Sequence, residues 1–177
     1  IVNSAFDNNN SEGWSGTTPG FQTYSNAEFY NCNYDFHQTI AGVKKGVYKV
    51  EVTAYYRHGN AENDAAEYTK FTETGTSVAQ YAKLYATTSV INAYDKPLPF
   101  ATSGAASESI TTEEASNTYG FIPNSMKSAA FYMSQDKYQP TYLVTAVEDG
   151  NITIGLKKST HIGDDWTLFD DWKLYDL

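Results

Sequence analysis

The amino-acid sequence predicts an all-β domain, a β-sandwich jelly roll with one or two short helices in long loops. The prediction rests on alternating apolar and polar residues in several short runs, on turn residues between these runs, and on a composition rich in Tyr and small polar residues. A chain of 177 residues has the usual length of one domain, so we expect residues 1–177 to form a single sandwich.

The clearest predicted strand is GVYKVEVTAYYR at residues 46–57. Alternate residues of a strand point to opposite faces, so one face of this strand is expected to be core and the other to meet solvent. The expected core residues are Tyr48, Val50, Val52, Ala54 and Tyr56. The preceding FHQTIAGVKKG predicts another strand and a turn at residues 41–46, and we expect these two strands to pair as an antiparallel hairpin.

Further strands are expected on both sides of this hairpin. AEFYNCNYDF predicts one or two strands upstream, VAQYAKLYATT predicts one downstream, and WTLFDDWKLYDL predicts the last. In TYLVTAVEDGNITIGLKK, Asp149-Gly150 is a typical turn between two alternating runs, which predicts a second hairpin.

Two polar stretches, residues 58–75 and 95–121, interrupt the strand pattern. Loops of this length are usually functional or carry a helix of their own. TTEEA carries a helix N-cap signature. NSMKSAAFYM, after Pro123, has apolar residues at helical spacing and predicts a short amphipathic helix with Met126 and Met133 on its core face.

The charge and composition exclude several classes of partner. The net charge is -9 and no Lys/Arg cluster is present, which argues against nucleic acid and against an anionic membrane surface. No apolar run approaches the roughly 20 residues of a membrane helix, so no membrane insertion is expected. Cys32 is the single cysteine, so we expect no internal disulfide and interpret it as a small packed residue.

The sequence carries no recognisable catalytic motif. It contains no G-x-S-x-G nucleophile elbow, no H-E-x-x-H zinc motif and no glycine-rich phosphate loop. A pair of carboxylates would suffice for glycoside hydrolysis, but among 21 acidic residues some pair lies at almost any separation. We therefore expect a protein that is not an enzyme.

Aromatic and polar side chains suggest a sugar site instead, because sugar rings stack on aromatic rings and their hydroxyls bind planar polar groups. Tyr55 and Arg57 share the expected solvent face of residues 46–57, and Glu28 and Tyr30 share one face of AEFYN. Trp166, after the HIGDD loop, is either a binding platform or a plug at the end of the sandwich. The alternative is that these residues are only cross-strand packing partners.

Asp170 occupies an unexpected position in the last strand. In WTLFDDWKLYDL, strict alternation places it on the same face as Trp166, Leu168 and Trp172. An ionised carboxylate facing a core requires hydrogen bonds, an opposite charge or a metal ion. Backbone N–H groups or a Lys or Arg side chain are alternatives to the metal.

Three segments resemble a known family. IVNSAFDNNNSEGW, HQTIAGVKKGVYKVEVTAYYR and FDDWKLYDL occur in the order of the opening, central and closing motifs of galactose-binding-domain-like jelly rolls. The closest resemblance is to carbohydrate-binding modules of secreted or surface proteins from glycan-degrading gut bacteria. It implies a secreted, periplasmic or cell-surface location, a polysaccharide or oligosaccharide partner, neighbouring domains in the same polypeptide, and a monomer.

The resemblance also implies a structural calcium ion that bridges the first and last strands. Its carboxylate ligands would be Asp7 and Asp170, while Asp171 would face the other way. Asp7 stands where the family more commonly has Glu. The function expected from the resemblance is a non-catalytic glycan-binding module; the alternative is a structural or protein-interaction sandwich that accompanies a catalytic domain and has no glycan site.

Overall fold

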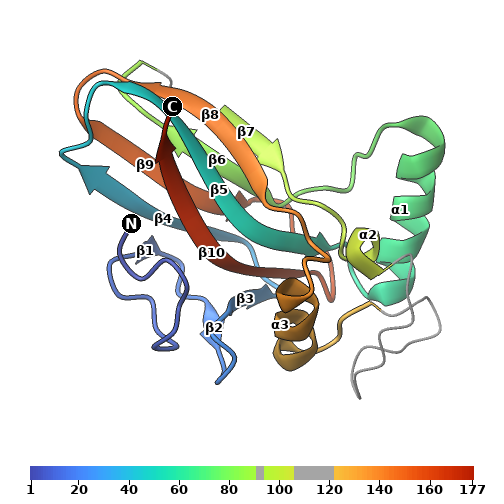
Figure 1. Ribbon diagram of the computed structural model, residues 1–177. Helices are drawn as coiled ribbons and strands as arrows, with labels where there is room; N and C mark the ends of the chain where they lie inside the picture. The colour runs from blue at the N-terminus through green and yellow to red at the C-terminus, as the bar shows by residue number, and fades with distance from the viewer. Residues whose placement is uncertain (91–93, 106–121) are drawn as a thin grey trace.

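The computed structural model describes residues 1–90, 94–105 and 122–177, which form two antiparallel five-stranded sheets packed face to face (Figure 1). The β4 sheet has the order β1-β4-β9-β6-β7, with bounds Ser15–Gly16, Tyr34–Ala41, Asn151–Lys158, Lys83–Thr87 and Tyr94–Pro97. The β5 sheet has the order β2-β3-β10-β5-β8, with bounds Gly20–Phe21, Ala27–Tyr30, Trp166–Asp176, Gly46–Arg57 and Thr141–Val147. The predicted β-sandwich is confirmed.

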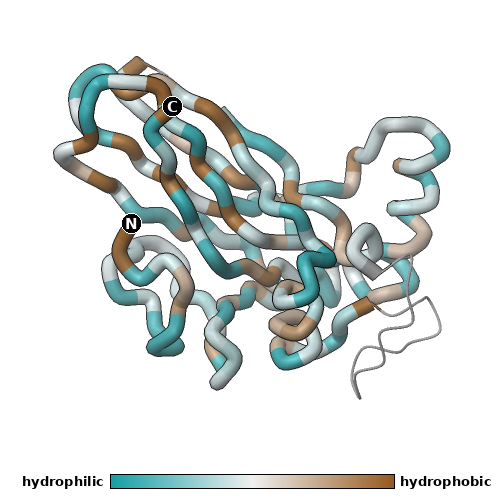
Figure 2. Tube along the Cα trace, in the orientation of Figure 1, coloured by the Kyte–Doolittle hydropathy of each residue, from teal (hydrophilic) through white to brown (hydrophobic). Residues whose placement is uncertain are grey.

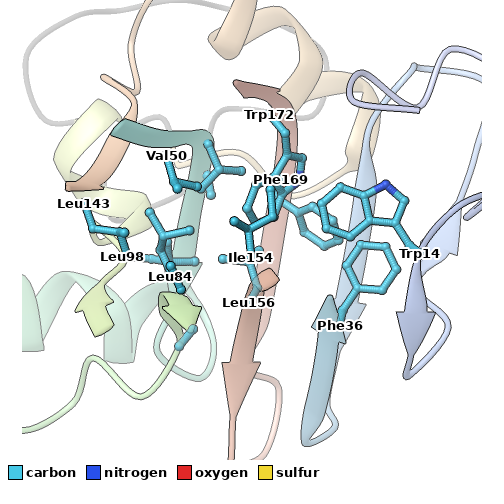
Figure 3. Close-up of a cluster of buried hydrophobic side chains, with 14 of the residues drawn as sticks. Trp14, Phe36, Val50, Leu84, Leu98, Leu143, Ile154, Leu156, Phe169 and Trp172 are labelled. Carbon is cyan, nitrogen blue, oxygen red and sulfur yellow. The ribbon is translucent and has the colours of Figure 1, made fainter. Parts of the chain in front are cut away.

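The main core lies between the two sheets and is built from their inner faces. All five residues predicted for the inner face of β5 belong to it. At one end of the core Trp14 stacks on Phe36 with ring centroids 4.7 Å apart, and Phe169 and Trp172 of β10 lie beside this pair (Figure 3). Figure 2 shows the corresponding alternation of hydrophobic and hydrophilic residues along the strands. Each large apolar side chain buried here contributes about 1.5–3 kcal/mol to stability.

Both predicted hairpins are wrong, because each turn carries the chain from one sheet to the other. β4 and β5 lie in different sheets, as do β8 and β9. The turn chemistry itself was predicted correctly: Gly150 has φ +82, and the Asp149 carboxylate accepts a hydrogen bond from the Asn151 N–H. Alternation shows which face of a strand is buried, but two strands that face each other across the core show the same pattern as two that pair side by side.

The predicted short helix is confirmed as α3, Met126–Ser134, which begins after the N-cap Ser125. Met126 is buried and Met133 is partly buried against a second, smaller core cluster, as expected for the core face of the helix. A short helix α2 spans Ala101–Ala105. The TTEEA signature lies outside the described residues. None of the helices in the described ranges is long and apolar enough to span a membrane.

The polar stretch at residues 58–75 folds as a helix of 14 residues, α1, Ala61–Thr74, which projects from one end of the sandwich (Figure 1). Asp64 is its buried residue. The Asp64 carboxylate accepts hydrogen bonds from the His58 N–H at 2.7 Å and from the Thr102 N–H and hydroxyl at 2.8 and 2.6 Å. Burial raises the pKa of Asp64, and these bonds oppose that rise. A carboxylate therefore connects α1 to the end of β5 and to α2.

Candidate functional site

The outer face of β5 near its C-terminal end is covered, not open to solvent as expected. The cluster beneath α3 includes Tyr55, which is 0% exposed. The Tyr55 ring lies between Tyr138, at a centroid distance of 4.6 Å, and Trp166, at 5.5 Å. Its hydroxyl has no hydrogen-bond partner among the described residues. The predicted exposure of Tyr55 is thus wrong, because the sequence of β5 does not reveal that a helix packs over its polar face.

The other four predicted ligand residues line one pocket of about 360 Å³ beside the start of α3, which we call the Arg57 pocket. β10 lies between β3 and β5, and in its register Trp166 stands opposite both Tyr30 and Arg57. The remaining wall comes from the chain before β3 and from the start of α3. The complete lining is Gln22, Glu28, Tyr30, Arg57, Asn124, Ser125, Met126 and Trp166.

Arg57 is buried and held in one orientation by three hydrogen bonds. Its Nε donates to the Gly59 carbonyl at 3.0 Å, Nη1 to Asn124 Oδ1 at 2.9 Å, and Nη2 to the Asp164 carbonyl at 3.1 Å. The guanidinium lies over the Trp166 ring, 5.1 Å from its centroid. A guanidinium has five N–H donors. Two of them therefore make no hydrogen bond among the described residues, and Arg57 lines the pocket.

Trp166 forms a wall of the pocket rather than an exposed platform. It is 4% exposed, and its indole Nε1 donates to Glu28 Oε2 at 2.6 Å. This bond fixes the Glu28 carboxylate and leaves its other oxygen available as an acceptor. A side chain at Gly20 would crowd Glu28, because a Cβ there would stand 3.1 Å from the Glu28 Cγ.

Tyr30 supplies the exposed aromatic ring that Trp166 does not. Its side chain is 52% exposed, and its hydroxyl donates to Asp164 Oδ1 at 2.8 Å. That hydrogen bond is the main reason why the pKa of Tyr30 is raised. Sequence reasoning missed Asn124 and Asp164, which orient Arg57 and Tyr30. Asp164 has φ +64, a conformation that Asp tolerates, so the GDD loop carried a weak signal of a constrained turn.

Asp170 does not share a face with Trp172, because β10 has a bulge. Asp171 and Trp172 together stand opposite the single residue Val52, and Asp171 adopts φ +54. The bulge returns Trp172 to the main core and leaves Asp170 on the outer face, opposite Thr53. Asp170 and Asp171 both line a second pocket of about 610 Å³ near the C-terminal end of α3. The expectation that Asp170 faces the main core is wrong, and so is the expectation that Asp171 faces the opposite way to Asp170, because both side chains line the same pocket.

Asp170 and Asp7, the two residues expected to bind calcium, are near enough for the charge of Asp7 to affect the pKa of Asp170, and Asp7 itself is exposed. The pKa of Asp170 is raised to about 7, chiefly by burial and in smaller part by the Asp171 and Asp7 carboxylates, while the Asp171 N–H and the Lys173 ammonium group oppose the rise. Asn9, in the same loop as Asp7, has a buried Oδ1 without a hydrogen-bond partner among the described residues. The described residues contain no cluster of three or more His, Cys, Asp or Glu side chains. Calcium also accepts amide and backbone oxygens, so this arrangement is compatible with it.

Comparison with known proteins gives matches at the level of structure. No protein-family model matches the chain, and no curated protein matches its sequence. The solved structure of TmCBM61 in complex with β-1,4-galactotriose is similar over 100% of this chain and 97% of that chain, with a TM-score of 0.56 and 13% sequence identity. BtGH115A, a family GH115 4-O-methyl-α-glucuronidase with specificity for decorated arabinogalactans, matches 96% of this chain and 17% of its own, with a TM-score of 0.45 and 11% identity. Over its whole length, this chain therefore has the β-sandwich fold found in the TmCBM61 structure.

Proposed function

We propose that this domain is a non-catalytic carbohydrate-binding module of a secreted, periplasmic or cell-surface protein, and that it binds glycan in the Arg57 pocket. The observation that carries the proposal is the convergence of an exposed ring, an oriented carboxylate and an oriented guanidinium in one pocket. Tyr30 offers a face for the C–H groups of a sugar ring, while Glu28 and Arg57 offer an acceptor and donors for its hydroxyls. The similarity in fold to TmCBM61, whose structure was solved with β-1,4-galactotriose, supports the proposal.

The described side chains of the pocket suit sugar binding, but they do not include the pair of carboxylates that glycoside hydrolysis requires. Glycosidases use two carboxylates that flank the scissile bond. Among the described residues that line the Arg57 pocket, Glu28 is the one acidic side chain, and its Oε2 is occupied by the Trp166 indole. The pocket is small and open to water, so sugar hydroxyls replace water at these groups, and we expect modest affinity.

Calorimetric titration tests the proposal, starting with β-1,4-galactotriose and continuing with hits from a glycan array. Tyr30→Ala and Glu28→Gln are expected to weaken binding about tenfold or more, which corresponds to about 1.4 kcal/mol. Tyr142→Ala is the matched control, because Tyr142 is 47% exposed on the same sheet and lies outside the pocket.

The alternative is a protein-interaction domain. One observation favours it: exposed apolar side chains occur along the outer face of the β5 sheet, away from α3, at Val47, Tyr142, Val144 and Tyr175. Absence of binding across a broad glycan array would favour this alternative.

We also propose that a structural calcium ion is held by Asp7 and Asp170, with Asn9 as a further oxygen ligand. The proposal is supported by the partly buried Asp170 carboxylate, whose pKa is raised in part by the exposed Asp7 carboxylate, and by the unpartnered Asn9 amide oxygen. The ion would supply the positive charge that stabilises an ionised Asp170 at this position. It would also connect the first loop to β10, beside the hydrogen bond from the Trp172 N–H to the Ser4 carbonyl.

A further inference from the structure

We infer that the outer face of the β4 sheet carries a second saccharide site, selective for acidic sugar residues that carry a carboxylate or sulfate group. Here Lys83 of β6 and Lys157 of β9 stand directly opposite each other and share one carboxylate, that of Asp95. The inference rests on the proposed function and extends it to a different sheet and a different sugar chemistry.

The pairing of Lys83 with Lys157 is unfavourable for the sheet by itself. Like charges directly opposite each other on neighbouring strands destabilise the pairing. The Asp95 carboxylate oxygens lie 3.5 Å from Lys83 Nζ and 3.3 Å from Lys157 Nζ, so one negative charge serves two ammonium groups. Each ammonium group has three N–H donors. Both lysines are partly exposed, and an anion between them would offset their repulsion.

The neighbouring acidic side chain, Asp35, interacts with Tyr85 and His37 rather than with the two lysines. Asp35 stands opposite Lys157 on β4, but its Oδ1 accepts the Tyr85 hydroxyl at 2.7 Å and lies 3.1 Å from His37 Nδ1. Lys157 Nζ in turn lies 5.0 Å from the centroid of the Tyr85 ring. These contacts keep the Asp35 carboxylate turned toward Tyr85 and place Lys157 over its ring.

A glycine allows the Tyr85 ring to lie against the sheet. Gly155 stands opposite both His37 and Tyr85, and a Cβ at this position would lie 2.8 Å from Tyr85 Cε1 and 2.5 Å from the Phe36 carbonyl oxygen. The Tyr85 ring therefore lies in place, with the Asp35 carboxylate and the Lys157 ammonium group against it, before any ligand arrives. A ligand then binds without the entropic loss of ordering them.

Lys83, Lys157, Asp35 and Asp95 border a pocket of about 360 Å³ whose chemistry suits an acidic sugar better than a polyanion such as nucleic acid. The Asp35 Oδ2, which has no hydrogen bond among the described residues, is able to accept a sugar hydroxyl. The third lysine of the lining, Lys158, is buried and paired with Asp165. The Tyr81 ring adds an aromatic surface. A chain with a net charge of -9 repels a long polyanion, whereas one anionic group on a saccharide needs only two local cations.

Calorimetry with three matched probes tests the inference: tetragalacturonate carries carboxylates, neocarratetraose sulfate carries sulfates, and β-1,4-galactotetraose is neutral. The double variant Lys83→Met/Lys157→Met is expected to bind one or both acidic probes about tenfold or more weakly, with unchanged affinity for the neutral probe. The acidic probe that binds identifies the anionic group. Raising NaCl from about 50 to about 300 mM should weaken binding of the acidic probe alone.

The controls separate this site from the Arg57 pocket. Tyr30→Ala should lower affinity for the neutral probe and leave acidic binding intact, while Lys49→Met removes a partly exposed lysine from the other sheet and should change neither. Amide chemical shifts should change in β6 and β9 when the acidic probe is added. The inference would be overturned if the acidic probes bound the parent no more tightly than the neutral probe, or if they bound the double variant as tightly as the parent. If the parent bound the acidic probes but not the neutral one, only the proposed function of the Arg57 pocket would be refuted.

Discussion

The protonation of Asp170 predicts how the stability of the domain changes with pH. A carboxyl whose pKa is higher in the folded state favours folding while it is protonated. The contribution of Asp170 is therefore complete below about pH 4 and is lost as the pH rises through about 7. The difference between about 7 and the ordinary value of 3.8 corresponds to about 4 kcal/mol. Because Asp170 is only partly buried and lines an open pocket, solvent screening reduces this to about 2 kcal/mol.

Urea denaturation of the parent and of Asp170→Asn between about pH 4 and pH 9 tests this effect. With chelator present, the variant should become more stable than the parent by about 2 kcal/mol above pH 8, and this advantage should shrink as the pH falls below about 7 and vanish near pH 4. Millimolar calcium should restore the parent and leave the variant unchanged. The control is Glu73→Gln, an exposed carboxylate on α1. A variant whose stability follows the parent at every pH would refute the assignment of the raised pKa to Asp170.

Three further substitutions test buried polar groups by urea denaturation. Lys158→Met removes the partner of the fully buried Asp165 carboxylate and should destabilise the fold by about 3–5 kcal/mol; a loss below about 1 kcal/mol would contradict it. Asp64→Ala removes three hydrogen bonds and should lower the free energy of unfolding by about 3 kcal/mol. It should also expose α1 to proteases, and unchanged protease resistance would contradict the role of Asp64 in connecting α1 to β5 and α2. Tyr55→Phe removes an unpartnered buried hydroxyl and should raise stability by about 1 kcal/mol without weakening glycan binding; weaker binding would show that the hydroxyl contacts ligand.

The sequence predicted the features that depend on local pattern. Alternation placed every expected inner residue of β5 in the core, and apolar spacing located α3. The same alternation put Glu28 and Tyr30 on one face of β3, where the structure finds them beside Arg57 and Trp166. These predictions succeeded because the side-chain period of a regular element is fixed by its backbone.

The failed predictions depend on partners far away in the chain. A turn at Gly150 is compatible with a hairpin and with a crossover between sheets, and only the packing of β9 against β4 and β6 decides between them. The bulge at Asp171 breaks the alternation on which the orientation of Asp170 was predicted. The helix α1 was left open rather than predicted, because its apolar face is weak: Ala61 and Ala65 are small and only partly buried, and Tyr68 and Phe71 contact only the edge of the fold at Phe100.

The helix α3 explains why four of the residues predicted to bind sugar line one pocket although Tyr55 is buried. An open sheet face would leave the Arg57 guanidinium free to move, and a mobile side chain loses entropy when it binds. By packing over Tyr55, α3 excludes water from that part of the face, and the chain just before it brings Asn124 to within 2.9 Å of Arg57 Nη1. The Asn26 side chain stabilises the position of α3 by donating a hydrogen bond to the Met126 carbonyl at 3.0 Å. The packing of α3 therefore removes Tyr55 from the proposed glycan surface and also orients the neighbouring arginine.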